Sequence, residues 1–298
     1  MYKGVLLSCA NLRSGDSMRL FRQYNGQYPY RVSYSDLTMQ MAEGISVDLL
    51  SQVHGLIQVR EQIQGKSRAS GMLEVESQRL FVKTSLLESW PSRLRVTFGQ
   101  QRRQGGFDWA VQEVINSVEA YRRGVPTPPL KGFGCRYGSR RLVSEVFMVS
   151  EWLEGHVDGL TWLRRPNVDG EAFLRSIFAL IQLMHDREVR HLDLWVANVM
   201  LDPQNPEAPK VIDLENCYIG RTDFLAETLG FQFGFLFRRE VHAKLDEARY
   251  DALVEQALNA YDGLDRERFR RVYEVSKRQH IGRKERSLIP RRGLLVVD

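Results

Sequence analysis

The chain has 298 residues, of which 43% are hydrophobic and 27% are charged. This length and composition are typical of a globular protein with one large domain or two lobes, and they exclude a disordered chain. No apolar run approaches the roughly 18 residues that a membrane-spanning helix needs. The three cysteines, Cys9, Cys135 and Cys217, lack the spacing of metal ligands, so they indicate a reducing compartment and hence the cytoplasm.

The net charge of +5 is unevenly distributed along the chain. Between Arg266 and Arg292 there are eleven Lys or Arg residues against three Glu residues. Such a segment is most often a solvated helical face, but it could also bind an anionic lipid surface or another polyanion. The sequence contains no recognised nucleic-acid-binding motif, so we expect no nucleic acid partner.

The first part of the chain predicts mainly strands. Residues 1–50 show no clear period, and we expect an extension or an early edge of the first lobe; the apolar run before Cys9 is too short for a processed signal. Three segments alternate in hydrophobicity and predict antiparallel strands: 55–63, 72–77 and 79–86. Between the first two, residues 64–71 predict a loop bounded by Gly65 and Gly71. Residues 89–106, a segment rich in arginine, are expected to have no regular secondary structure.

The middle of the chain changes from strands to helices. A helix is predicted over 107–124, with Asp108 as its N-cap and Gly124 at its end. The proline-rich residues 125–130 must be extended, and residues 140–153 predict a pair of strands that ends near Glu151. The next helix, over 167–187, has an apolar face formed by Phe173, Ile177, Leu180, Ile181 and Met184.

The remaining chain predicts a short buried strand over 209–217 and, from about Arg221, mostly helices. A strand-rich part is therefore followed by a helix-rich part, with the change near residue 152. We predict an α+β fold of two lobes with a cleft between them. The expected domains are an N-terminal lobe over 1–152 and a C-terminal lobe over 153–298.

Five polar residues in apolar surroundings could carry chemistry: Lys83, Glu113, Asp193, Asn198 and Asp213. Each alone has an ordinary explanation, such as a solvated strand lysine or a turn-forming aspartate. A phosphoryl-transfer site needs a cation on the donor phosphates and an acid that holds this cation. It also needs a carboxylate for the attacking hydroxyl and two oxygen ligands for Mg²⁺. The five residues supply these groups in chain order.

The same residues resemble the protein-kinase-like superfamily. The stretch HLDLWVAN resembles its catalytic loop, and VIDLE resembles its metal-binding strand end. This resemblance implies that Lys83 contacts the phosphates of ATP and is held by Glu113, and that Asn198 and Asp213 bind Mg²⁺. It also implies two catalytic residues in the loop. Asp193 would orient the acceptor hydroxyl, and His191 would hold the loop by hydrogen bonds rather than transfer a proton.

The stretch MVSEWLEG resembles the hinge that receives adenine through its backbone, which gives Glu151 and Leu153 as further ATP-binding residues. The loop with Gly65 and Gly71 is in the position of the phosphate-covering loop, but it lacks the full glycine pattern and could be an ordinary hairpin loop. Lys66 and Arg68 could contact phosphate there or only solvent.

Departures from protein kinases narrow the family. Leu192 stands where a protein kinase usually has Arg, and Glu215 stands where it usually has Gly. The stretch QEVINSVEAYRRGVPTPPLKGFG resembles the lipopolysaccharide core kinases, which phosphorylate 3-deoxy-manno-octulosonic acid or heptose. In that group a helix Glu precedes a Gly-x-Pro-x-Pro turn, which favours Glu113 over its competitor Glu119.

This resemblance implies an ATP-dependent and Mg²⁺-dependent kinase of a lipopolysaccharide inner-core sugar. The enzyme would be cytoplasmic and peripheral on the inner face of the inner membrane, where the basic C-terminal region would bind the anionic surface. One alternative is a kinase of another small molecule, such as an aminoglycoside or choline, whose cationic substrate a basic cleft opposite Asp193 would disfavour. The other is a pseudokinase, which the presence of all five residues disfavours.

Overall fold

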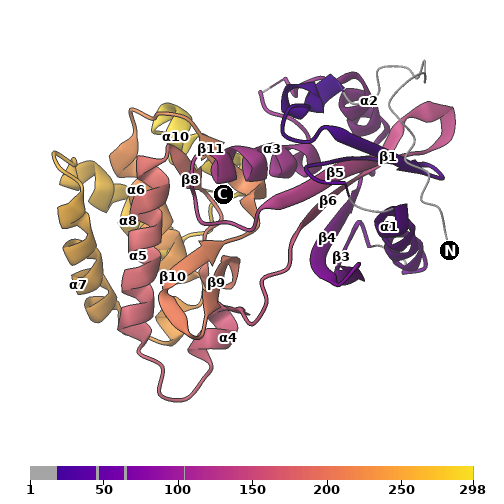
Figure 1. Ribbon diagram of the computed structural model, residues 1–298. Coiled ribbons are helices and arrows are strands. Elements are labelled where there is room, and N and C mark those ends of the chain that lie inside the picture. Colours follow the sequence, from indigo (N-terminus) through magenta and orange to yellow (C-terminus); the bar gives the residue numbers. More distant parts are fainter. Residues whose placement is uncertain (1–18, 45–46, 64–65, 104, 298) are drawn as a thin grey trace.

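The computed structural model describes residues 19–44, 47–63, 66–103 and 105–297 (Figure 1). Cys9 and Gly65 lie outside these residues, as does the N-terminal segment for which no processed signal was predicted. In the described part, a strand-rich N-terminal half is followed by a mainly helical C-terminal half, in agreement with the predicted fold class. The proposed boundary at residue 152 stays a prediction.

The N-terminal half is built on a six-stranded antiparallel sheet with the order β1-β2-β5-β6-β4-β3. Its strands are β1 (Tyr30–Tyr34), β2 (Leu37–Met41), β3 (Arg68–Val75), β4 (Gln78–Leu86), β5 (Leu130–Tyr137) and β6 (Val143–Glu151). Residues 30–41 thus form an edge of the first lobe, which was one of the two readings of the N-terminal segment. Residues 140–153 contain one strand, β6, and not a pair, because no turn interrupts the chain between Val143 and Glu151.

Helices cover both faces of this sheet. Helix α1 (Val47–Glu61) buries Leu50, Val53 and Ile57 against one face. The other face is covered by the 3₁₀ helix η1 (Arg19–Tyr24), α2 (Trp90–Phe98) and α3 (Trp109–Arg122). A short 3₁₀ turn, η2 (Ser139–Arg141), precedes β6.

Two helices in this half were not predicted. Residues 55–61 belong to α1 rather than to a strand, and residues 62–63 follow its end, because the buried positions repeat every three or four residues once the segment is read from Val47. Residues 89–106 are not irregular throughout, since α2 begins after the N-cap Ser89 and ends at Gly99 in the left-handed conformation. Asp108 stands at the N-cap position of α3, but its carboxylate does not cap the helix.

The C-terminal half surrounds a core formed by α5 (Gly170–Asp186) and α6 (Leu225–Arg238). The predicted apolar face of α5 is buried at all five positions. Small strands lie beside these helices: β7 (Val157–Asp158), β8 (Val189–His191), β9 (Val199–Asp202), β10 (Asn205–Val211) and β11 (Cys217–Ile219). The remaining helices are α4 (Gly159–Leu163), η3 (Val196–Asn198), η4 (Leu214–Asn216), η5 (Val241–Ala243), α7 (Glu247–Ala257), η6 (Leu258–Ala260), α8 (Arg266–Arg278), α9 (Arg283–Arg286) and α10 (Ile289–Arg292).

Helices α6 and α8 approach each other closely at two glycines. A Cβ atom at Gly230 would lie 2.5 Å from the carbonyl oxygen of Phe269, and one at Gly234 would lie 2.6 Å from that of Tyr273. After α8 the chain turns back, so that α9 and α10 end beside α6 and the C-terminus lies near the junction of the two halves (Figure 1). None of the helices in the described part of the chain combines the length and the apolar character that a membrane crossing requires.

Candidate active site

Lys83, on β4, joins two carboxylates from different parts of the chain. Its Nζ atom donates to Glu113 Oε1 at 2.6 Å and to Asp213 Oδ1 at 2.8 Å. Burial acts to lower the pKa of Lys83, but the two carboxylates more than offset it, so this pKa is raised. Lys83 is therefore a fixed cation at the junction of the sheet and the C-terminal half. Glu119, the competitor of Glu113, instead pairs with Arg122.

Helix α3 positions the segment that carries Asp213. Asn116, one turn after Glu113, donates through Nδ2 to the carbonyl oxygens of Leu214 at 2.7 Å and Glu215 at 3.3 Å. Asp213 itself has φ 60° and ψ 54°, a left-handed conformation that is uncommon outside glycine. The backbone is thus held in a conformation that directs the Asp213 carboxylate to Lys83.

The predicted catalytic loop is organised by His191. The amide of Asp193 donates to His191 Nδ1 at 3.1 Å, so Nδ1 is unprotonated and His191 Nε2 donates to the carbonyl oxygen of Ile212 at 3.1 Å. Burial lowers the pKa of His191, which favours this neutral form. Because both ring nitrogens are engaged with backbone groups, the geometry favours the bracing role of this predicted catalytic residue over proton transfer.

Asn198 lies in the same loop and closes it. Its Nδ2 atom donates to the carbonyl oxygen of Asp193 at 2.9 Å, and its own carbonyl oxygen accepts from the Ile212 amide at 3.0 Å. Because Nδ2 is used as a donor, Oδ1 is the atom that Asn198 can offer to a cation. The side chains of Asn198 and Asp213 supply oxygen ligands of the kind that Mg²⁺ prefers, so they fit the predicted metal.

Two arginines from the C-terminal segment contact the Asp193 carboxylate. Arg286 Nη1 donates to Asp193 Oδ1 at 2.6 Å, and Arg283 Nη2 lies 3.5 Å from Oδ2. Arg283 Nη1 also donates to Glu215 Oε1 at 2.9 Å. The predicted catalytic carboxylate is therefore surrounded by arginines that pair with it and with Glu215.

A further ion pair links the sheet to the same group. Arg68, on β3, donates to Glu215 Oε2 at 2.8 Å and lies 3.8 Å from the centre of the Trp109 ring. The prediction that Gly71 ends a loop between two strands was wrong. Helix α1 precedes this segment, and Gly71 pairs with Val82 inside the sheet. Lys66 is exposed, and the contact of Lys66 or Arg68 with phosphate stays a prediction.

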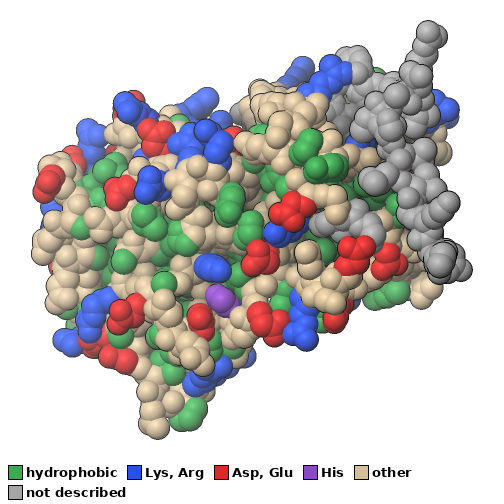
Figure 2. Space-filling view, in the orientation of Figure 1, with side chains coloured by type: hydrophobic (Ala, Val, Ile, Leu, Met, Phe, Trp, Pro, Cys, Tyr) green, Lys and Arg blue, Asp and Glu red, His purple; other side chains and the backbone are tan. Residues whose placement is uncertain are grey.

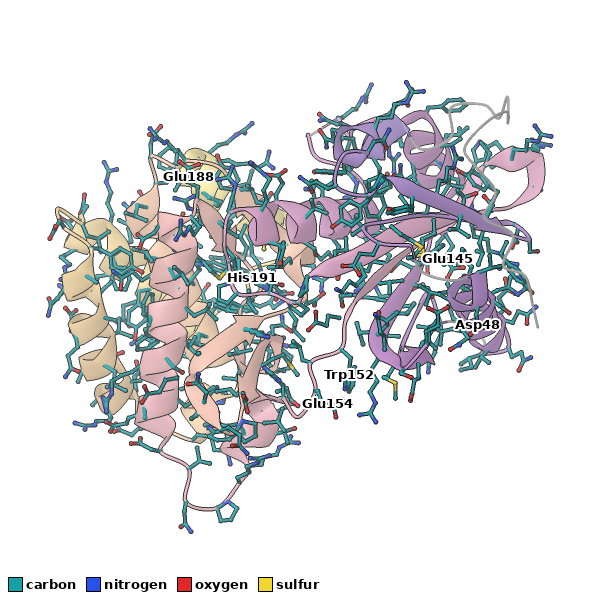
Figure 3. The ribbon with its side chains drawn as sticks, in the orientation of Figure 1. Asp48, Glu145, Trp152, Glu154, Glu188 and His191 are labelled. Atoms are coloured by element: carbon teal, nitrogen blue, oxygen red, sulfur yellow. The ribbon has the colours of Figure 1, made fainter. Side chains whose placement is uncertain are left out.

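The predicted hinge follows the end of β6. Trp152 and Glu154 lie on the segment that leaves the sheet, and His191 lies in the C-terminal half (Figure 3). The Glu151 amide donates to the carbonyl oxygen of Pro129 at 3.1 Å. Among the described residues the Leu153 amide has no such acceptor, which leaves it for a ligand.

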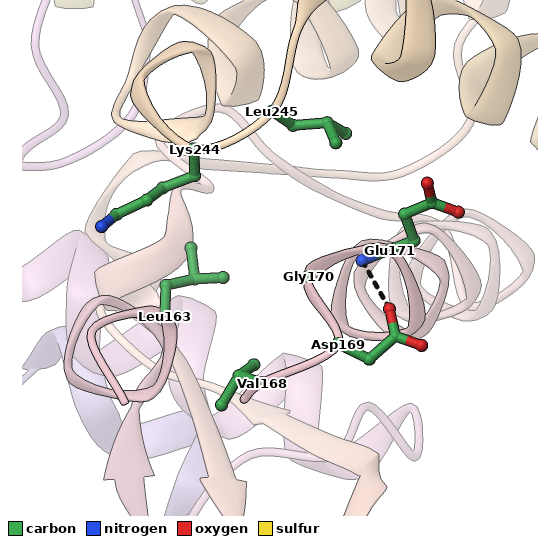
Figure 4. Close-up of a pocket in the computed structure, with 7 residues that line it drawn as sticks. All are labelled: Leu163, Val168, Asp169, Gly170, Glu171, Lys244 and Leu245. Carbon is green, nitrogen blue, oxygen red and sulfur yellow. Dashed lines mark hydrogen bonds between the residues drawn. The ribbon is translucent and has the colours of Figure 1, made fainter. Parts of the chain in front are cut away.

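A separate cavity is formed around the N-terminus of α5 (Figure 4). It is lined by Leu163, Val168, Asp169, Gly170, Glu171, Lys244 and Leu245. None of the predicted site residues lines it. The Asp169 carboxylate accepts from the backbone amides of Glu171 and Ala172, which is ordinary helix capping.

With this geometry described, the comparisons identify the family. A sequence model of the lipopolysaccharide kinase (Kdo/WaaP) family matches residues 61–223, more than half of the chain. The chain belongs to this family. The predicted recognition and the kinase-like fold class are thereby confirmed, and the family activity is that of a lipopolysaccharide kinase. No curated protein sequence matches the chain.

Many solved structures are similar to the chain, including the following two. One is described as "WaaP in complex with acyl carrier protein", with 22% identity, a TM-score of 0.39, and coverage of 74% of this chain and 99% of that chain. The other is a divergent Toxoplasma kinase lacking the glycine-rich loop, with 11% identity, a TM-score of 0.45, and coverage of 75% and 88%.

The sequence reasoning missed the residues that surround this set. Arg283 and Arg286 were counted only as part of a basic segment, and Asn116 was not considered. Glu215 was noted as a departure from protein kinases but not as an ion-pair partner. The polar Asn116, three residues after Glu113 and hence on a neighbouring part of the same helix face, was the one available signal.

Proposed function

We propose that the protein transfers the γ-phosphate of ATP to a sugar hydroxyl of the lipopolysaccharide inner core, a heptose or 3-deoxy-manno-octulosonic acid. The observation that carries this proposal is the Lys83 ion pair with Glu113 and Asp213 beside the loop of Asp193. Family membership supports a phosphotransferase, and the arrangement agrees with the positions that phosphoryl transfer requires.

In the proposed mechanism each residue has one task. Lys83, held by Glu113, binds the α- and β-phosphates of ATP. The Leu153 amide and the Glu151 carbonyl receive the adenine edge. Asn198 and Asp213 hold Mg²⁺, which neutralises charge on the phosphates when it is bound.

Asp193 accepts a hydrogen bond from the sugar hydroxyl and aligns it with the γ-phosphorus; as the new O–P bond forms, ADP leaves and Asp193 takes up the hydroxyl proton late in the step. Because the transition state is loose, alignment contributes more than early removal of the proton. His191 does not exchange a proton in this scheme. It holds the Asp193 amide and the Ile212 carbonyl, and so fixes the loop.

The basic surroundings of Asp193 favour an anionic acceptor. Arg283, Arg286 and Arg68 lie at or near the carboxylates of Asp193 and Glu215. Aminoglycosides and choline are cationic, and Asp193 and Glu215, the carboxylates that could attract them, are already paired with arginines. The inner core of lipopolysaccharide carries carboxylate and phosphate groups, which suits the partly exposed side chains of Arg68 and Arg283. We further propose a peripheral position on the inner face of the inner membrane, with the exposed arginines of α8 in contact with anionic lipid.

The test is incubation of the protein with labelled ATP, Mg²⁺ and core-truncated lipopolysaccharides, followed by location of the new phosphate. We expect transfer to an acceptor that carries the inner-core sugars and none to lipid A alone. Asp193→Asn and Lys83→Met should each reduce kcat at least about a hundredfold. Transfer by Asp193→Asn at the wild-type rate would contradict the mechanism, and a pseudokinase would transfer nothing in any of these reactions.

A further inference from the structure

Arg286 is a buried cation that reaches the catalytic loop from the C-terminal segment. Only 4% of its surface is exposed, and its partner Asp193 is 93 residues earlier in the chain. The distance of 2.6 Å between Nη1 and Asp193 Oδ1 is short for a hydrogen bond between an arginine and a carboxylate. A charge buried at this depth needs such a partner, and here the partner is the residue expected to receive the substrate.

The side chain of Arg286 is itself held in place by α6 and by its own segment. Its Nε atom donates to the carbonyl oxygen of Ile281 at 2.8 Å, and Nη1 is 3.4 Å from that of Leu192. The guanidinium lies 4.4 Å from the centre of the Phe235 ring, so it has a cation–π contact on one face. The orientation of Arg286 is therefore fixed independently of Asp193.

The two oxygens of Asp193 are consequently not equivalent. Oδ1 is occupied by Arg286, whereas the contact of Oδ2 within the described chain is the longer one of 3.5 Å to Arg283, whose side chain is 55% exposed. Oδ2 is the oxygen left for an incoming hydroxyl. His191 and Asn198 hold the backbone of Asp193, so the rotation of its side chain depends on the arginines.

We propose that Arg286 is a positioning residue that fixes the rotamer of Asp193 and directs Oδ2 to the acceptor hydroxyl. This inference rests on the proposed function, since it assigns Arg286 a role in the same reaction. Leu192, next to Asp193, packs in one apolar cluster with Phe235 and Ile281. The C-terminal segment thus packs against the catalytic loop. It orients the Asp193 side chain and does not contact the substrate directly.

A double-mutant cycle with Arg286→Met and Asp193→Asn tests this role. Arg286→Met should lower kcat at least about tenfold and change KM for ATP less than about twofold, because ATP binds through other residues. The double variant should be no slower than Asp193→Asn alone, since Arg286 acts only through Asp193. Losses that multiply in the double variant, or an unchanged kcat in Arg286→Met, would overturn the proposal.

Lys277→Met is the matched control for loss of a buried cation. The side chain of Lys277 is 1% exposed and pairs with Glu247, Asp251 and Glu274, away from the catalytic loop. This variant should unfold at a lower temperature but keep the wild-type kcat per folded molecule. If it loses kcat as Arg286→Met does, the effect is one of general stability and the proposal is wrong. Should Arg286→Met not fold, Arg286→Lys replaces it, with a smaller loss of kcat expected.

The cycle is measured twice, with lipopolysaccharide as the acceptor and with water as the acceptor, by release of labelled phosphate from ATP. One outcome is that the losses of kcat for ATP hydrolysis are non-additive in the cycle while no phosphate is transferred to lipopolysaccharide. This result would overturn the proposed acceptor but support the role of Arg286. Additive losses in both reactions would overturn the role of Arg286 while transfer by the wild type still supported the proposed function. A wild type inactive in both reactions would overturn both proposals.

Discussion

Two buried histidines support the catalytic loop through a single glutamine. His185 Nε2 lies 2.6 Å from Gln232 Oε1, and Gln232 Nε2 donates to the carbonyl oxygen of His191 at 3.1 Å. Burial lowers the pKa of His185 to about 4, and it lowers that of His191 as well. Both side chains are therefore neutral at neutral pH, and protonation of His185 would place a charge in the core, where no carboxylate pairs with it among the described residues.

The lowered pKa of His185 predicts a loss of stability in mild acid. Well above pH 6.5, the ordinary pKa of histidine, His185 is unprotonated in both the folded and the unfolded chain, so its contribution does not change. As the pH falls from 6.5 toward 4, only the unfolded chain takes up this proton, and the free energy of unfolding should fall, by about 2 kcal/mol at pH 5. Urea unfolding at about pH 7.5 and about pH 5 measures this difference.

The variant His185→Gln should reduce the pH dependence by the same amount, whatever its effect on stability at the higher pH. His242, which is exposed, gives the matched control His242→Gln. If the two variants have the same difference in stability between the two pH values, His185 is not the group responsible.

At the level of elements, α6 connects the core of the C-terminal half to the active site. It carries Gln232, which bonds to His191, and Phe235, which contacts Arg286. Its opposite contact is with α8, where Gly230 and Gly234 let the two backbones approach. The position of the catalytic loop is thus tied to the packing of α6 against α8.

Gly234→Ala should separate these helices. The new Cβ atom would lie 2.6 Å from the carbonyl oxygen of Tyr273 and 2.7 Å from Ser276 Cβ, and the backbone cannot yield as a flexible side chain would. We expect a loss of about 1–3 kcal/mol in the free energy of unfolding, together with a lower kcat. Thermal or urea unfolding measures the first effect and the phosphate-transfer assay measures the second.

Gly55→Ala is the control within another helix. Position 55 lies inside α1, and no atom lies within 4 Å of a Cβ placed there. Alanine should therefore stabilise the protein by up to about 1 kcal/mol, because it favours the helix more than glycine does. A Gly234→Ala variant that is as stable as Gly55→Ala would contradict the close packing of α6 and α8.

The same elements explain what the sequence could predict. The prediction of the apolar face of α5 was correct, because this helix is long enough for its apolar residues to repeat at the helical period over several turns. The α1 segment was misread because alternation over nine residues fits both a strand and part of a helix. For α2, the cap residues Ser89 and Gly99 mark both ends in the sequence, so this helix could have been predicted from them.

At the scale of the whole molecule, the site is assembled from segments far apart in the chain. Lys83 and Asp213 are 130 residues apart, and Arg68 and Glu215 are 147 apart. The kinase-like set predicted that Glu113 holds Lys83 and that Asp213 belongs to the same site, but it did not predict the ion pair between Lys83 and Asp213. The contacts of Arg283 and Arg286 could not be predicted, because a basic segment shows its charge in the sequence but not its partners.

The basic C-terminal region is therefore less available to a membrane than its composition implies. Lys277 and Arg278 pair with Glu247, and Arg286 is buried against Asp193. Arg270 and Arg271 are exposed on α8. If the proposed membrane contact exists, exposed side chains of this kind must carry it, since charges neutralised within the fold attract lipid weakly.

Figure 2 shows basic and acidic side chains interspersed over one face of the molecule, so net charge alone does not define a membrane-binding surface. The double reversal Arg270→Glu and Arg271→Glu should weaken binding to vesicles rich in anionic lipid at least about tenfold, on the basis of about 1 kcal/mol for each basic residue near the surface. Sedimentation with vesicles measures the binding. Reversal of the exposed pair Arg164 and Arg165 changes the net charge equally at another site and should have a smaller effect. Equal losses from both pairs would show that net charge governs association, and the proposed contact through α8 would be abandoned.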